Sequence, residues 1–136
     1  MVYEDPVDVT VNVNQLAQFN CTVNCSCTRN VGWFIAGRSN VIDNSVPGLT
    51  IMSPEQQSPT CTSGRKTYIF RVLVTKALEK SEIAIYCAAY ENRSHQSQCS
   101  FSGTSYSRPA LLTGKLRFYV CLNVLLYTCT TLIAFH

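Results

Sequence analysis

Residues 83–90 read Ile-Ala-Ile-Tyr-Cys-Ala-Ala-Tyr, and this stretch decides the fold. Its side chains alternate, so a strand here turns Ile85 and Cys87 toward the same buried face. Residues 16–23 read Leu-Ala-Gln-Phe-Asn-Cys-Thr-Val and alternate in the same way, with Cys21 facing inward. The sequence therefore predicts two strands that each bring one cysteine to a common core.

The chain's one tryptophan, Trp33, lies between these strands in sequence, in the short apolar run 31–36. We expect Trp33 and Phe19 to pack in the same core as the two cysteines. A bridge between Cys21 and Cys87 closes a loop of about 66 residues. On the chain-entropy account, such a bridge stabilises the fold by roughly 4 kcal/mol.

Alternation recurs over residues 7–13 and 67–75, and turn residues separate the apolar runs. A last short strand is expected over 109–113, and one helical turn over 76–83. No stretch has a convincing amphipathic helical pattern. About seven strands at this spacing predict an all-β domain, either a two-sheet sandwich or a barrel.

The eight cysteines of this 136-residue chain favour an oxidising compartment. Three Asn-x-Ser/Thr sequons, at Asn20, Asn24 and Asn92, add the expectation of a glycosylated secretory protein. A cytosolic protein is the alternative, and the cysteines and sequons argue against it. No signal-peptide pattern follows Met1, so we expect an incomplete or trimmed chain.

The inward cysteines and tryptophan resemble the immunoglobulin superfamily, and the resemblance covers roughly residues 5–114. It implies a Greek-key sandwich of two sheets. Antibody-like domains carry Tyr two residues before the second cysteine and Asp a few residues upstream, where this chain has Ile85 and Ser81. The resemblance is therefore to a V-like or I-like domain of an adhesion or receptor-type protein rather than to an antigen receptor.

Four further cysteines precede the tail: Cys25, Cys27, Cys61 and Cys99. The resemblance places their three loops at one end of the sandwich. It implies that Cys61 and Cys99 each bridge to one of Cys25 and Cys27, with the pairing left open. Such bridges would either only hold long loops in place or also stiffen the end of the domain that contacts a partner. A zinc site is a weaker alternative, because Cys-x-Cys with distant cysteines is poor zinc-ribbon spacing.

Little in the sequence favours catalysis, and no cofactor or metal is expected. The two histidines, His95 and His136, have no carboxylate or nucleophile nearby in sequence. Disulfide exchange through Cys25-Ser-Cys27 is the remaining enzymatic alternative. The small net charge of +3 comes from scattered residues, which argues against nucleic acid.

The resemblance instead implies binding, through end loops or the front sheet, to a protein partner on a cell surface. Homophilic contact and a soluble secreted module both stay open. The candidate contact residues are aromatic or basic and lie near the loop after Cys87 or point outward from the front sheet; they are Tyr90, Arg93, Phe101, Tyr106, Phe34 and Tyr86.

Residues 115–136 form an apolar C-terminal segment, uncharged over 118–135. This length is near the roughly 20 residues that span a bilayer, so a membrane span is the first interpretation. Lys115 and Arg117 precede the segment, which opposes the positive-inside orientation of an outside domain. A lipid-anchor signal and a truncated terminus are the alternatives.

Overall fold

The described part of the computed structural model forms ten β-strands and no helix; it comprises residues 2–24, 28–52, 61–91, 103–122 and 128–134. The strands are β1 (Val2–Glu4), β2 (Val9–Asn12), β3 (Leu16–Asn24), β4 (Thr28–Ile35), β5 (Leu49–Ile51), β6 (Arg65–Val74), β7 (Leu78–Glu91), β8 (Gly103–Tyr106), β9 (Ala110–Leu122) and β10 (Thr128–Ala134).

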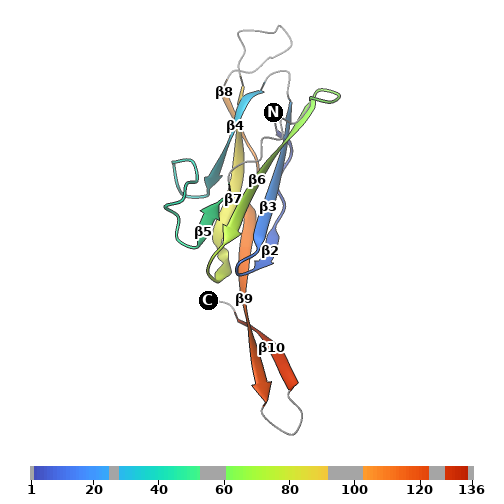
Figure 1. The fold of residues 1–136 in the computed structure, drawn as a ribbon. Helices are drawn as coiled ribbons and strands as arrows, with labels where there is room; N and C mark the ends of the chain where they lie inside the picture. Colours follow the sequence, from blue (N-terminus) through green and yellow to red (C-terminus); the bar gives the residue numbers. More distant parts are fainter. Residues whose placement is uncertain (1, 25–27, 53–60, 92–102, 123–127, 135–136) are drawn as a thin grey trace.

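The strands form two packed sheets (Figure 1). One sheet has the order β1-β3-β6-β5. The other has the order β10-β9-β7-β4, with β8 on β7 and β2 parallel to β9. The N-terminal segment joins both sheets, because β1 pairs with β3 and β2 pairs with β9. This arrangement confirms the predicted all-β, two-sheet sandwich.

The core between the sheets contains the predicted residues. Cys21 and Cys87 form a disulfide with a Cα–Cα distance of 6.4 Å, and both are fully buried. Trp33 stacks on Phe70, with ring centroids 5.3 Å apart. Burial of apolar area between the sheets, together with the bridge, stabilises the sandwich. Phe19 and Ile85 also lie in this core, as predicted.

The expected helical turn over residues 76–83 is wrong. Strand β7 already begins at Leu78, which is fully buried in the core. The pairing of β7 with β9 shifts register between Leu78 and Ile83, so an irregularity absorbs the extra residues there. Close packing at Gly114 supports this corner, since a Cβ there would lie 2.8 Å from Cγ1 of Val74.

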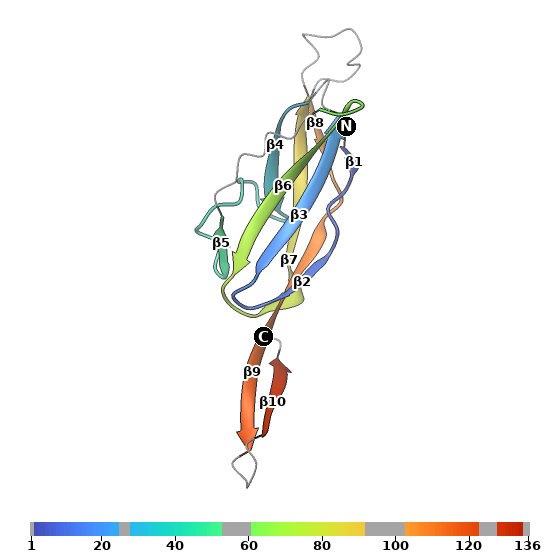
Figure 2. The same ribbon diagram turned by 45° about the vertical axis from the view of Figure 1, so that its right-hand side comes forward.

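Strand β9 is much longer than the short strand expected over residues 109–113. Its C-terminal half pairs with β10 in antiparallel register, from Leu116 opposite Ala134 to Leu122 opposite Thr128. Figures 1 and 2 show this hairpin projecting beyond the end of the sandwich. Within the described residues, no helix has the length and apolar character needed to cross a membrane.

Candidate functional site

An aromatic surface covers the outer side of the sheet that contains β4, β7 and β8. Strand alternation turns this set of side chains away from the core, as the sequence predicted for Phe34 and Tyr86. Phe34 is buried and yet is not part of the core cluster between the sheets. We call this surface the aromatic face; it consists of Phe34, Val41, Tyr86, Tyr90 and Tyr106.

Three rings of the aromatic face form a continuous row across three strands. Phe34 lies opposite Tyr86 in register, and their rings stack with centroids 5.5 Å apart and planes 18° apart. Tyr106 meets Tyr86 edge-on, with centroids 6.1 Å apart and planes 62° apart. Both geometries suit the quadrupoles of aromatic rings, so each contact adds about 1 kcal/mol beyond its buried area. The row is therefore a packed unit.

Small residues beneath the rings let them lie close to the sheet. A Cβ at Gly32 would be 3.0 Å from Cε2 of Phe34 and 3.4 Å from Cε2 of Tyr90. The Phe34 and Tyr90 rings thus approach each other over Gly32. Ala88, opposite Gly32 in register, is fully buried although it lies outside the core cluster.

The aromatic face divides into supporting and exposed residues. Phe34 is 8% exposed, while Tyr106 is 64% exposed and Tyr90 is 36% exposed. Val41 bridges to Phe34 at the sheet margin and is 56% exposed. Phe34 therefore offers little contact area itself and supports its neighbours. Val41 was missed by sequence reasoning, because only its bridge to Phe34 places it on this face.

Ser107 fixes the end of β8 to β7 directly behind the exposed Tyr106. Its hydroxyl accepts the Cys87 N–H at 2.9 Å and donates to the Arg108 carbonyl at 3.0 Å. Its own N–H donates to the Cys87 carbonyl at 2.9 Å. These bonds position Tyr106 relative to the disulfide. Sequence reasoning missed Ser107, since a serine in a polar loop carries no signal for this role.

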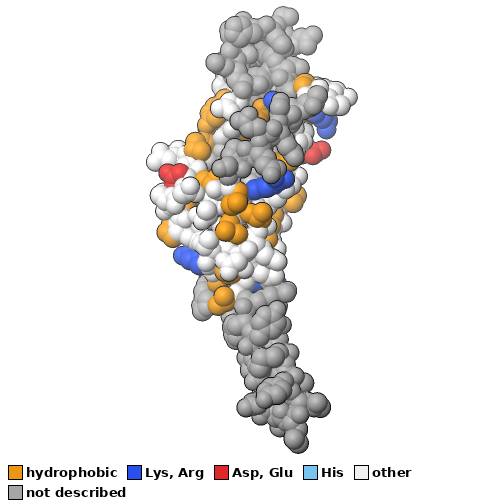
Figure 3. Space-filling model, viewed as in Figure 1, with side chains coloured by type: hydrophobic (Ala, Val, Ile, Leu, Met, Phe, Trp, Pro, Cys, Tyr) orange, Lys and Arg blue, Asp and Glu red, His pale blue; other side chains and the backbone are white. Residues whose placement is uncertain are grey.

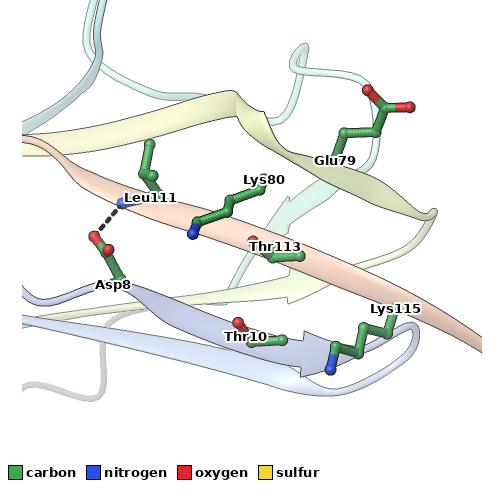
Figure 4. Close-up of a pocket in the computed structure, with 7 residues that line it drawn as sticks. All are labelled: Asp8, Thr10, Glu79, Lys80, Leu111, Thr113 and Lys115. Atoms are coloured by element: carbon green, nitrogen blue, oxygen red, sulfur yellow. Dashed lines mark hydrogen bonds between the residues drawn. The ribbon is translucent and has the colours of Figure 1, made fainter. Parts of the chain in front are cut away.

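A cleft continues the same outer face toward β2 and β9 (Figure 4). It has a volume of about 470 Å³ and is lined by Asp8, Thr10, Glu79, Lys80, Leu111, Thr113 and Lys115. The Asp8 carboxylate accepts the Leu111 N–H at 2.8 Å, which ties the N-terminal segment to β9. No part of this cleft was foreseen from sequence.

Lys and Arg side chains are dispersed on the side shown in Figure 3. Within the described ranges, no group of three His, Cys, Asp or Glu side chains could hold a metal ion.

Two hydrogen bonds from Ser45, one from its side chain and one from its backbone, lower the pKa of the exposed Asp43 carboxyl.

The other predicted site residues lie in several places. Asn20 is exposed on the outer face of β3, and Asn24 is partly buried at its end. Cys61 is disulfide-bonded. The expected bridging partners of Cys61, and the remaining candidates, fall outside the described residues; they are Cys25, Cys27, Cys99, Asn92, Arg93 and Phe101.

The sequence matches no protein-family model and no curated protein. Among solved structures, the chain is similar to the titin domains Z1Z2 in complex with telethonin, with a TM-score of 0.55 and 17% identity over 96% of this chain. The chain spans 62% of that titin chain's length.

Two further titin structures resemble the chain. A chimeric Z1Z2 carrying an exogenous peptide from decorin has a TM-score of 0.50 and 18% identity, covering 85% of this chain and 93% of the other. Titin domain M3 has a TM-score of 0.51 and 13% identity, covering 84% and 94%. At these identities the likeness establishes the fold, which is an immunoglobulin-like sandwich.

Proposed function

We propose that this chain is an extracellular protein-binding module, a V-like or I-like domain of a cell-surface adhesion or receptor protein. The aromatic face carries the proposal. Tyr106, Tyr90 and Val41 are exposed on the outer side of one sheet, around the packed rings of Phe34 and Tyr86. A rigid, exposed set of tyrosines is typical of the centre of a protein interface.

The chemistry of this face favours a protein over a small molecule or nucleic acid. Its five residues are all uncharged, and the face lies on a sheet rather than in a deep pocket. Tyrosine gives a partner apolar area together with a hydroxyl for hydrogen bonding, at little conformational cost. Preordering of the Phe34–Tyr86–Tyr106 row lowers that cost further.

The proposed compartment rests on two features of the sandwich. The Cys21–Cys87 bridge is buried, and a second bridge involves Cys61, which suits an oxidising environment. Asn20, the acceptor residue of a sequon, has an exposed side chain on the strand face away from the aromatic face. The titin Z1Z2 structure with telethonin is one case of an immunoglobulin-like pair in a protein complex.

Staining of intact cells with fluorescent tetramers of the full chain tests this proposal. We expect Tyr106→Ser to reduce staining about ten-fold or more, because hot-spot side chains dominate interface energy. The matched control is Tyr3→Ser, which removes a 40% exposed tyrosine from β1 in the other sheet. Protease treatment of the cells should abolish staining, because the partner is a protein. Equal losses for the two variants would contradict the proposal.

A soluble secreted binding domain is the alternative. The same aromatic face would serve it, and the two differ in how the chain is retained by cells. Alkaline extraction of membranes from expressing cells separates them, because a membrane-anchored chain stays in the pellet. Sedimentation velocity of the chain with Tyr106 intact or replaced by Ser tests whether the partner is a second copy.

A further inference from the structure

The cleft adjoins the aromatic face on one continuous surface. Leu111 lines the cleft and lies opposite Ala84 on β7, two residues before Tyr86. Side chains two residues apart on a strand share a face and lie roughly 7 Å apart. Thr10 and Thr113, opposite each other on β2 and β9, extend the surface beyond Leu111. A partner seated on the aromatic face would therefore reach the cleft.

A buried hydroxyl lines the cleft. Thr113 is only 7% exposed, and no side-chain hydrogen bond joins its hydroxyl to any described residue. Because Thr113 lines the cleft and its hydroxyl has no side-chain partner among the described residues, this hydroxyl can donate to a group that enters the cleft. Thr10 contributes a second hydroxyl from the neighbouring strand (Figure 4). The two hydroxyls are donors for an acceptor that enters the cleft.

The charges that line the cleft favour a single negative group. Lys80 and Lys115 bring two ammonium groups from different strands. The carboxylate of Asp8 is held by the Leu111 N–H, and Figure 4 shows Glu79 pointing away from the other side chains. Ammonium and hydroxyl donors match the acceptor-only oxygens of a carboxylate. A carboxylate carries one negative charge, which balances the charges of Lys80, Lys115 and Asp8 taken together.

We propose that the cleft binds the carboxylate of a Glu or Asp side chain of the protein partner. The identity of that partner rests on the proposed function, whereas carboxylate binding by the cleft does not. The carboxylate lies between Lys80 and Lys115 and accepts the Thr113 hydroxyl, while its methylene groups contact Leu111. The partner thus combines an apolar contact for the aromatic face with a flanking acidic residue.

A nuclear magnetic resonance titration of the full chain tests the cleft without the partner. The probe is N-acetyl-glutamate α-amide, and its neutral match is N-acetyl-glutamine α-amide, both at constant ionic strength. We expect saturable shifts of the Thr10, Leu111 and Thr113 amides with the charged probe alone. Lys80→Gln should weaken binding about three- to ten-fold, as expected for loss of one charge-assisted contact. Lys66→Gln, which removes a lysine from the other sheet, should not change it.

A second variant separates a binding role from a structural one. Thr113→Val keeps the shape and should leave the urea midpoint unchanged or raise it, while weakening probe binding. A lowered midpoint with unchanged binding would overturn the proposal, as would equal shifts from the neutral probe. Tighter binding of inorganic phosphate than of the charged probe would also overturn it. None of these results depends on the cell-staining experiment, so the two proposals fail separately.

Discussion

The two outer faces of this sandwich are built on the same strand alternation and differ in chemistry. The face on β4, β7 and β8 presents a packed row of rings, Phe34–Tyr86–Tyr106. The face on β3 and β6 presents a polar ladder, in which Arg71 donates to Gln18 at 3.0 Å and Gln18 donates to Asn20 at 3.2 Å. We call the polar part of this second surface the polar face; it consists of Gln18, Asn20, Thr22, Thr67 and Arg71. The partly buried Ile69 lies on the same side, opposite Asn20.

The difference favours the aromatic face over the polar face as the partner-contacting surface of the binding module that we propose. Hydrogen bonds between exposed side chains contribute little net stability, and a glycan at Asn20 would shield the polar face further. Exposed rings, by contrast, favour association, because their removal from water by a partner lowers the free energy of the complex. The core disulfide lies between the two faces and links the two sheets that carry them.

The largest expected effect removes the bridge that both faces share. Replacement of Cys21 and Cys87 together by Ala should lower the free energy of unfolding by about 4 kcal/mol, because the loop that they close is long. Urea denaturation measures this loss. The sheets that carry the polar and aromatic faces should unfold together in one transition. Two separate transitions would show that the faces fold independently.

A smaller effect distinguishes the faces themselves. Phe34→Ala should cost about 3 kcal/mol, because the ring is buried against Tyr86 and over Gly32. Ile69→Ala on β6, from a half-buried position on the same side as the polar face, should cost about 1 kcal/mol. Equal losses in urea denaturation would mean that the aromatic row is no better packed than the polar face.

Ser107→Ala should cost about 1–2 kcal/mol, because it leaves the buried Cys87 N–H without its side-chain acceptor. The expected secondary effect is altered ring contact between Tyr106 and Tyr86, seen as changed aromatic proton shifts. Thr67→Ala breaks the 2.8 Å hydroxyl pair with Thr22 on the polar face and serves as the control. It should leave those ring shifts unchanged.

The smallest effect concerns pH, in the loop beside Val41. Hydrogen bonds from Ser45 lower the pKa of Asp43 in the folded chain. Their stabilisation is therefore present above the unfolded pKa of Asp and is lost as the pH falls through the lowered value. Carboxyl titration by nuclear magnetic resonance should give a higher midpoint in Ser45→Ala than in the unchanged chain. An unchanged midpoint would show that the Ser45 side chain does not lower the pKa of Asp43.

Alternation alone predicted which side chains point inward and outward, because a strand repeats every two residues. It placed Cys21, Trp33 and Cys87 in the core and turned Phe34 outward. It could not show that Phe34 is buried. Tyr86 on the neighbouring strand stacks on the Phe34 ring, and the missing side chain at Gly32 lets the ring lie close to the sheet.

Features that depend on the pairing of strands far apart in the sequence could not be predicted either. The parallel pairing of β2 with β9 creates the cleft around Thr113, and it joins residues about a hundred positions apart. The helical turn expected over 76–83 failed for a related reason. The β7–β9 pairing extends the strand back to Leu78, which tertiary packing fixes in the core.

Glycan shielding of each face tests the central claim most directly. Thr104→Asn with Tyr106→Thr creates a sequon on β8 that places a glycan on the aromatic face. Ile69→Asn with Arg71→Thr creates the matched sequon on β6, beside the polar face. With glycosylation verified by mass spectrometry, the β8 glycan should abolish tetramer staining of cells and the β6 glycan should leave it intact. Retained staining with the β8 glycan, or loss only with the β6 glycan, would contradict the account.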